Sequence, residues 1–134
     1  MLFGVSLIAV LAATVAAFAL GGIWYSVLFG KAWTEVAGVD SSGDPYSHPN
    51  PGIVYPILFV LNLLAAFAFG YLFAGSTFQA WILRGCLTGL CLVVFSMAIN
   101  YLGANRPLKL LIIDGSFQFL RLALFGIVFA LLGA

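Results

Sequence analysis

Long, uninterrupted apolar stretches constrain the fold of this chain more than any other feature of its sequence. Hydrophobic residues make up 64% of the 134 residues and charged residues only 7%, whereas soluble domains carry about 25% charged residues. A water-soluble fold of this size could not bury so much apolar surface. Because the hydrocarbon core of a bilayer holds no water, each stretch is predicted to be a helix that satisfies its own backbone. The predicted fold class is therefore all-α, a polytopic membrane protein.

Four transmembrane spans fit these apolar stretches. The stretch from Ile53 to Tyr101 is too long for one span of about 20–25 residues, and it divides at the small, polar turn Gly75-Ser76-Thr77. The predicted spans cover residues 3–29, 53–74, 78–101 and 108–132, and residues 30–52 form a loop rich in turn-forming residues. We predict a single domain, residues 1–134, in which the four helices form one bundle.

Lysine and arginine near the ends of the spans predict the orientation. We call side B the side of the bundle that holds the 30–52 loop and the turn before the last span. Side B carries Lys31, Arg106 and Lys109, whereas side A holds both termini and has only Arg84 near it. Positive residues concentrate on the cytoplasmic side of membranes. We therefore predict that side B is cytoplasmic and that both termini lie outside, with the first span retained because it lacks the charged leader of a signal peptide.

Rows of small residues spaced by four predict where the helices touch. Such rows let two backbones approach closely in lipid. We favour packing within one bundle over a dedicated dimer interface, because small residues line most polytopic interfaces. The rows are Ala9, Ala13, Ala17 and Gly21, then Ala66, Gly70 and Ala74, then Gly85 and Gly89, and finally Gly126 and Ala130.

Arg121 is the most unusual residue, because it lies near the middle of the last span. A charged side chain there costs at least about 2.5–3.5 kcal/mol on insertion scales. It is roughly 20 Å of helix from the terminal carboxylate and about equally far from side B, so it cannot reach water and requires partners inside the protein. Arg84 lies nearer to its own helix end and is predicted to snorkel to the surface.

Polar residues at matching depth predict a layer around Arg121. Such a layer could join the helices or serve a function, and the sequence leaves both alternatives open. The predicted layer contains Thr14, Asn62, Gln118 and Arg121, with Asp114 and Ser96 just above it.

Residues that carry catalytic or metal chemistry are few. His48 is the only histidine, so no site built from two histidines can form within the chain. Cys86 and Cys91 match no ligand motif, and no phosphate-binding glycine loop or nucleophile–base pair is present. The five lysine and arginine residues are scattered, which argues against nucleic acid as a partner. We predict no catalytic residue, no metal and no cofactor, and we do not expect an enzyme.

Two segments of the chain resemble a known family. Residues 21–33, Gly-Gly-Ile-Trp-Tyr-Ser-Val-Leu-Phe-Gly-Lys-Ala-Trp, resemble the end of the first span in the uncharacterised bacterial membrane family catalogued as domain of unknown function 1761. Residues 100–118 resemble its later signature. The resemblance implies a four-helix protein of the bacterial inner membrane and implies no activity. It also implies shared features near the side-B ends of the helices, which are Trp24, Tyr25, Lys31, Trp33, Asn100, Arg106, Pro107 and Asp114.

Two functional classes remain open. An accessory or interaction subunit of a larger membrane assembly is favoured by the small-residue rows and by the absence of catalytic motifs. The alternative is a small homo-oligomeric permease or channel for an anion or small polar solute, with Asp114, Gln118 and Arg121 as its polar cluster. The predicted partners are the lipid bilayer and either other membrane subunits or further copies of this chain.

Overall fold

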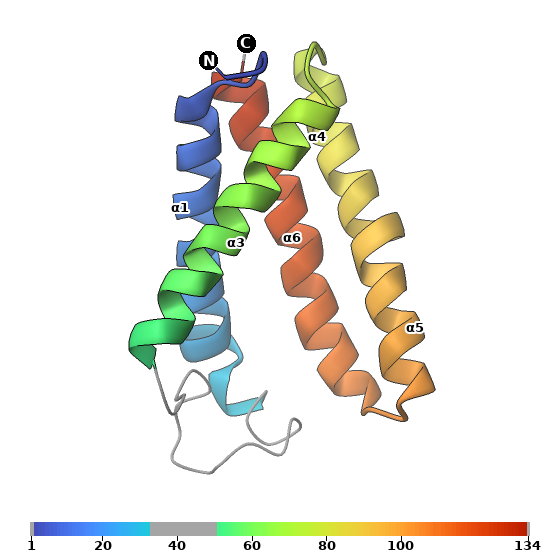
Figure 1. The fold of residues 1–134 in the computed structure, drawn as a ribbon. Coiled ribbons are helices and arrows are strands. Elements are labelled where there is room, and N and C mark those ends of the chain that lie inside the picture. Colours follow the sequence, from blue (N-terminus) through green and yellow to red (C-terminus); the bar gives the residue numbers. More distant parts are fainter. Residues whose placement is uncertain (1, 33–50, 134) are drawn as a thin grey trace.

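The fold, seen in a computed structural model that describes residues 2–32 and 51–133, is a bundle of four long helical segments (Figure 1). All four are long and apolar enough to cross a membrane, which confirms the predicted fold class. Two of them contain a π-helical stretch. The segments are α1 (Leu7–Ile23) with the π-helix η1 (Trp24–Leu28), α3 (Pro51–Leu72), then α4 (Phe78–Leu87), the π-helix η2 (Thr88–Val94) and α5 (Phe95–Gly103), and finally α6 (Leu108–Leu132).

The turn between α3 and α4 lies where the sequence places it. Gly75 adopts a φ of +82°, a conformation that costs glycine little. The Thr77 side chain then accepts a hydrogen bond from the backbone N–H of Ala80 at 3.2 Å and so caps α4. Pro107 directly precedes α6, where its missing N–H costs no helical hydrogen bond.

The helical boundaries differ from the predicted spans in two ways. The first helix begins at Leu7 rather than at residue 3, because Phe3 and Gly4 adopt positive φ in a tight turn that pairs Leu2 with Val5. The π-helical segments η1 and η2 were not predicted, since apolar periodicity does not distinguish them from α-helix. Most of the predicted 30–52 loop, with Trp33 and His48, lies outside the described residues.

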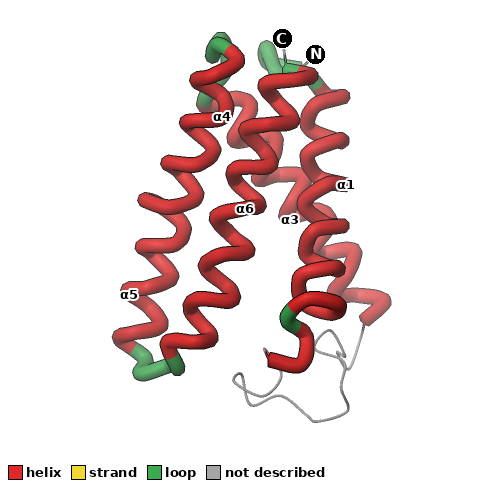
Figure 2. Tube along the Cα trace, turned by 180° about the vertical axis from the view of Figure 1, so that it is seen from behind, coloured by secondary structure: helices red, strands yellow, loops and turns green. Residues whose placement is uncertain are grey.

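Helix α6 occupies the centre of the arrangement. It packs against α1 on one side and against α4 and η2 on the other, while α3 packs mainly against α1 and meets α6 only briefly (Figures 1 and 2). Both termini and the α3–α4 turn lie at one end of the bundle, and the α5–α6 turn lies at the other. The first end is side A of the sequence analysis and the second is side B.

The closest helix contact joins α4 to α6 through two glycines. A Cβ atom built on Gly85 would lie 2.5 Å from the Leu122 carbonyl oxygen, and one built on Gly126 would lie 2.5 Å from the Trp81 carbonyl oxygen. Close backbone approach of this kind is how small residues hold helices together in lipid. The prediction that these rows pack within one bundle is therefore confirmed for α4 and α6.

The buried side chains form two separate clusters. The larger one lies toward side A, where Phe69, Trp81 and Phe129 pack together and the small residues of α1 fit beneath them. The smaller one lies toward side B and consists of Trp24, Ile113 and Phe117. The middle of α6, which contains Arg121, lies between these two clusters.

We expect Gly126→Ala to lower the free energy of unfolding by about 1–3 kcal/mol, because the added methyl group would force two backbones apart. Gly22→Ala is the matched control, since it also replaces a helical glycine but its Cβ meets no atom within 4 Å. Thermal unfolding in detergent, followed by circular dichroism, measures the difference. Equal stability of the two variants would contradict the close α4–α6 contact.

Candidate functional site

Arg121 is held in the middle of the bundle by two neutral amide side chains. Its Nε donates a hydrogen bond to Asn62 Oδ1 on α3 at 2.7 Å, and its Nη1 donates to Gln118 Oε1 at 3.3 Å. Its Cζ also lies 5.0 Å from the ring centroid of the buried Phe125, a cation–π distance. The side chain is half-buried. The depth match between Arg121, Asn62 and Gln118 that the sequence suggests is therefore found in the structure.

The charge of Arg121 is not balanced by any carboxylate in the described part of the chain. Asp114 is the only acidic residue there, and its hydrogen bonds go to other groups. A guanidinium has five N–H donors, and only two of those of Arg121 have partners among the described residues. The Nη2 group is among the donors that remain available.

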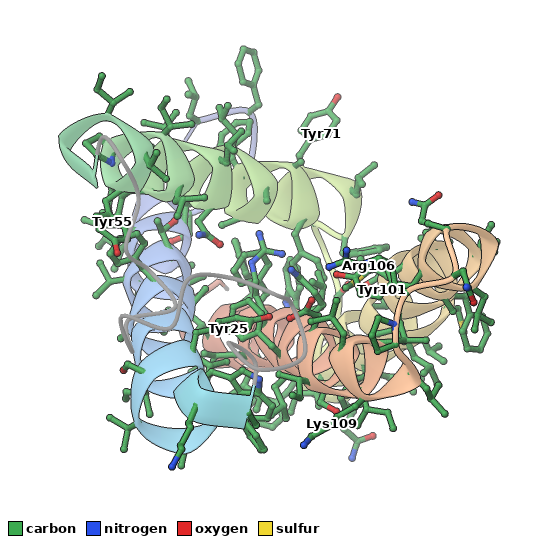
Figure 3. All side chains as sticks on the ribbon, turned by 90° about the horizontal axis from the view of Figure 1, so that it is seen from below. Tyr25, Tyr55, Tyr71, Tyr101, Arg106 and Lys109 are labelled. Carbon is green, nitrogen blue, oxygen red and sulfur yellow. The ribbon has the colours of Figure 1, made fainter. Side chains whose placement is uncertain are left out.

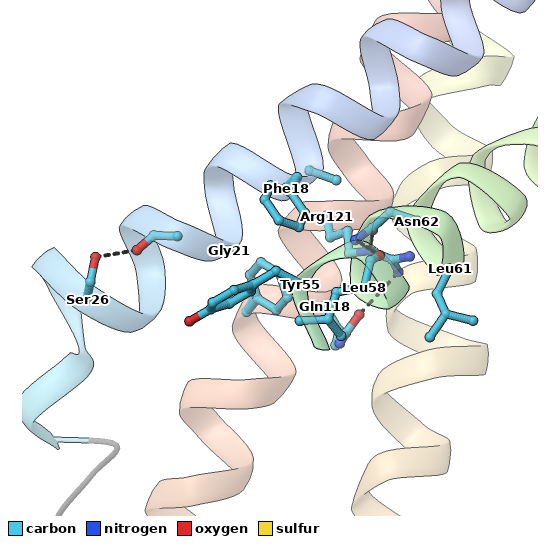
Figure 4. A pocket seen from close by; sticks show the side chains of 12 residues that line it. Phe18, Gly21, Ser26, Tyr55, Leu58, Leu61, Asn62, Gln118 and Arg121 are labelled. Atoms are coloured by element: carbon cyan, nitrogen blue, oxygen red, sulfur yellow. Dashed lines mark hydrogen bonds between the residues drawn. The ribbon is translucent and has the colours of Figure 1, made fainter. Parts of the chain in front are cut away.

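A cavity of about 730 Å³ opens beside this guanidinium, between α1, α3 and α6. Figure 4 shows Arg121 lying against Asn62 and Gln118, with the hydroxyl of Tyr55 pointing away from it. The remaining wall is largely apolar. It includes Ala17, Phe18, Leu58, Leu61 and Phe117. Among the described residues that line the cavity, Arg121 is the only charged one.

Asp114 forms a second network that is separate from the first. It is 8% exposed and accepts hydrogen bonds at 2.6 Å from the hydroxyl of Tyr25 and at 2.6 Å from the hydroxyl of Tyr101. Figure 3 shows both tyrosines near α6, seen from the side-B end. Asp114 thus ties η1 and α5 to α6, two helical turns away from Arg121. The predicted single layer is divided into two networks.

A second hydrogen bond joins η1 to α6 at the side-B end. Trp24 donates from its indole Nε1 to the carbonyl oxygen of Ile113 at 3.0 Å. Consecutive residues of η1, Trp24 and Tyr25, therefore bind consecutive residues of α6, Ile113 and Asp114. This arrangement fixes the end of the first span against the beginning of the last one.

The other residues of the predicted layer bond to their own helices. Thr14 is fully buried and donates to the Val10 carbonyl oxygen at 2.7 Å, and the exposed Ser96 donates to the Leu92 carbonyl oxygen. Neither joins the Arg121 or the Asp114 network among the described residues. Arg84 donates to Ser76 in the α3–α4 turn, so its side chain extends toward side A, the direction in which the sequence predicts it to snorkel.

The features predicted for side B have different environments. Trp24 and Tyr25 donate hydrogen bonds to Ile113 and Asp114 of α6. Lys31, Asn100 and Arg106 are exposed. Trp33 lies outside the described residues. The sequence patterns did not link Tyr25 and Tyr101 to Asp114. Their shared position near side B was the available signal.

These observations define a small multi-pass helical membrane protein with an open cavity between α1, α3 and α6 that is lined by one arginine. The profile of the family described as "Protein of unknown function (DUF1761)" matches residues 8–130. The chain therefore belongs to this family, as the resemblance of its two segments implied. No curated protein and no solved structure shows significant similarity to the chain.

We expect Tyr101→Phe to lower the free energy of unfolding by about 1–3 kcal/mol, because it removes one hydrogen bond to a buried carboxylate. Tyr71→Phe is the control, since the Tyr71 side chain is 58% exposed on α3. Chemical unfolding in mixed detergent micelles measures both variants. A loss for Tyr101→Phe no larger than that for Tyr71→Phe would contradict the role of this carboxylate as a tie between helices.

Proposed function

We propose that this membrane protein binds an anion in the cavity between α1, α3 and α6, as part of a small permease or channel. One observation carries the proposal. The guanidinium of Arg121 faces a sizeable cavity while its protein partners, Asn62 and Gln118, are both neutral. Ionisable side chains within membrane spans usually mark a substrate or ion pathway.

Electrostatics favours an anion over a neutral solute. A cation in an apolar interior is stabilised most by an opposite charge that also accepts its hydrogen bonds. The available donors of Arg121 lie beside a space that is large enough for a ligand. An arginine needed only to join helices would gain little here, since polar pairs between helices in lipid average about 0.6 kcal/mol.

An accessory role has less support from the packing. The small-residue rows that favour it in the sequence pack inside the bundle, as Gly85 and Gly126 do between α4 and α6. Such rows are then not available as a docking surface for another subunit. Because one bundle of four helices leaves little room for a continuous pore, transport would use several copies of the chain.

Charge distribution supports an orientation. We propose that the protein lies in the bacterial inner membrane, as the family resemblance implies, with side B in the cytoplasm. Arg106 and Lys109 are exposed at the side-B end, beyond or at the ends of their spans. Both termini would then lie outside the cytoplasm.

Anion binding is tested by the change in thermal stability on adding chloride, acetate or benzoate. Bound anion raises the stability of the folded state, by about 2.7 kcal/mol at a concentration of 100 times Kd. We expect at least one of these anions to stabilise the wild-type protein and Arg84→Met, which removes an exposed arginine remote from the cavity.

The same anion should not stabilise Arg121→Met, because that variant lacks the charge and the donors. The comparison uses the shift on adding the anion, so a difference in starting stability does not affect it. Equal shifts in Arg121→Met and Arg84→Met would refute the site.

Orientation is tested with a reporter fused to the C-terminus. We expect alkaline phosphatase, which is active only outside the cytoplasm, to be active in this fusion, and a green fluorescent protein fusion to remain dark. The opposite pattern would reverse the assignment of side B without affecting the cavity.

A further inference from the structure

We propose that the cavity takes an organic monocarboxylate, with its carboxylate on Arg121 and an apolar body against the walls formed by α1 and α3. This inference rests on the proposed anion binding and specifies the class of anion. Three observations support it, which are the charge of the cavity, the donors that face it, and the chemistry of its walls.

The charge of the cavity matches a single negative charge. Arg121 is the only charged residue among its described lining residues, and Asp114 is engaged by Tyr25 and Tyr101. A ligand with one negative charge neutralises the guanidinium. A ligand with two would leave one charge unpaired in an apolar interior, which is strongly unfavourable.

The unpaired donors of the lining residues suit a planar group with two oxygens. Asn62 holds the guanidinium in place, and its own Nδ2 is fixed by a hydrogen bond to the Leu58 carbonyl oxygen at 3.1 Å. The free Nη2 donors, the second N–H of Nη1 and the amide nitrogen of Gln118 have no partner among the described residues. The planar fork of arginine matches the two oxygens of a carboxylate.

The size and the walls of the cavity require an organic body. A volume of about 730 Å³ lies within the range of about 300–1,000 Å³ typical of sites for organic ligands. A halide, which is comparable in size to a water molecule of about 30 Å³, would leave most of the cavity empty. The ring of Phe18 and the side chain of Leu58 offer an apolar surface beside the charged end (Figure 4). Phe117 also lines the cavity.

A monocarboxylate with an apolar body could reach the cavity from two sources. An aromatic or short aliphatic acid would arrive from water, and a fatty acid would arrive from the bilayer. Both present one carboxylate on an apolar body, so a direct comparison of the two kinds of ligand identifies the source.

The test measures binding of 2-naphthoate to the purified full-length protein in nanodiscs by titration calorimetry. Acetate is the ligand without an apolar body, and 2-naphthamide is the ligand without a charge. We expect 2-naphthoate to bind at least 10-fold more tightly than either. We also expect Arg121→Lys, which keeps the charge but removes the fork, to weaken its binding at least 10-fold.

A variant that fills the cavity keeps the test independent of Arg121. A Cβ built on Gly22, which lines the cavity, meets no atom within 4 Å, so Gly22→Leu places its side chain in open space. Gly103→Leu is the matched control at the end of α5, where a Cβ is equally unobstructed. We expect Gly22→Leu to weaken 2-naphthoate binding at least 10-fold and Gly103→Leu to leave it unchanged.

The possible outcomes separate this inference from the proposed function. If acetate binds as tightly as 2-naphthoate and both require Arg121, the anion site stands and the inferred apolar body of the ligand is refuted. If 2-naphthamide binds as tightly as 2-naphthoate, the cavity recognises only apolar bodies and the inference fails. If no anion binds, both proposals fail. Laurate that binds more tightly than 2-naphthoate assigns the source to the bilayer, and weaker binding assigns it to water; both results support the carboxylate class.

Discussion

The guanidinium of Arg121 lies in the middle of an apolar bundle, and the side chains around it must accommodate its charge. Arg121 lies about 16–20 Å from the two ends of α6, so its charge must be accommodated within the protein. The protein meets this demand with two neutral amides, Asn62 and Gln118, and an aromatic ring, Phe125. These groups satisfy hydrogen bonds and orient the side chain but leave its charge unneutralised. An interior that retains a positive charge beside an open cavity is suited to bind an anion.

The two ends of the bundle are closed in different ways, and the cavity lies between them. Toward side A, glycines bring the backbones of α4 and α6 together, and Phe69, Trp81 and Phe129 fill the remaining space. Toward side B, Asp114 holds one tyrosine from each neighbouring segment, and the indole of Trp24 binds the backbone of α6. Because α3 packs mainly on α1 and meets α6 only briefly, the space between these helices is not filled by side chains. Packing at side A and side B holds the bundle together, so the cavity between α1, α3 and α6 can remain unfilled.

The sequence predicts the features that depend on local chemistry or on depth. Long apolar stretches and the turn at Gly75 define the spans, and the approach of Gly85 to α6 follows from small-residue spacing. The Arg121–Asn62 contact follows from depth alone, because both residues lie near the middle of their spans. The contact of Tyr25 and Tyr101 with Asp114 does not follow, since it depends on the rotation of three helices about their axes. The cavity is also invisible in the sequence, because it results from the oblique course of α3.

The location of a bound carboxylate in a crystal structure would show whether Arg121 binds an anion in the cavity. Crystals of the protein grown with 4-iodobenzoate would reveal the iodine by its anomalous scattering and the carboxylate by its density. We expect one iodine inside the cavity near Phe18 and Leu58, with the carboxylate within hydrogen-bonding distance of Arg121 Nη2. Iodine found only on the lipid-facing surface, with the guanidinium paired to a protein carboxylate, would contradict it.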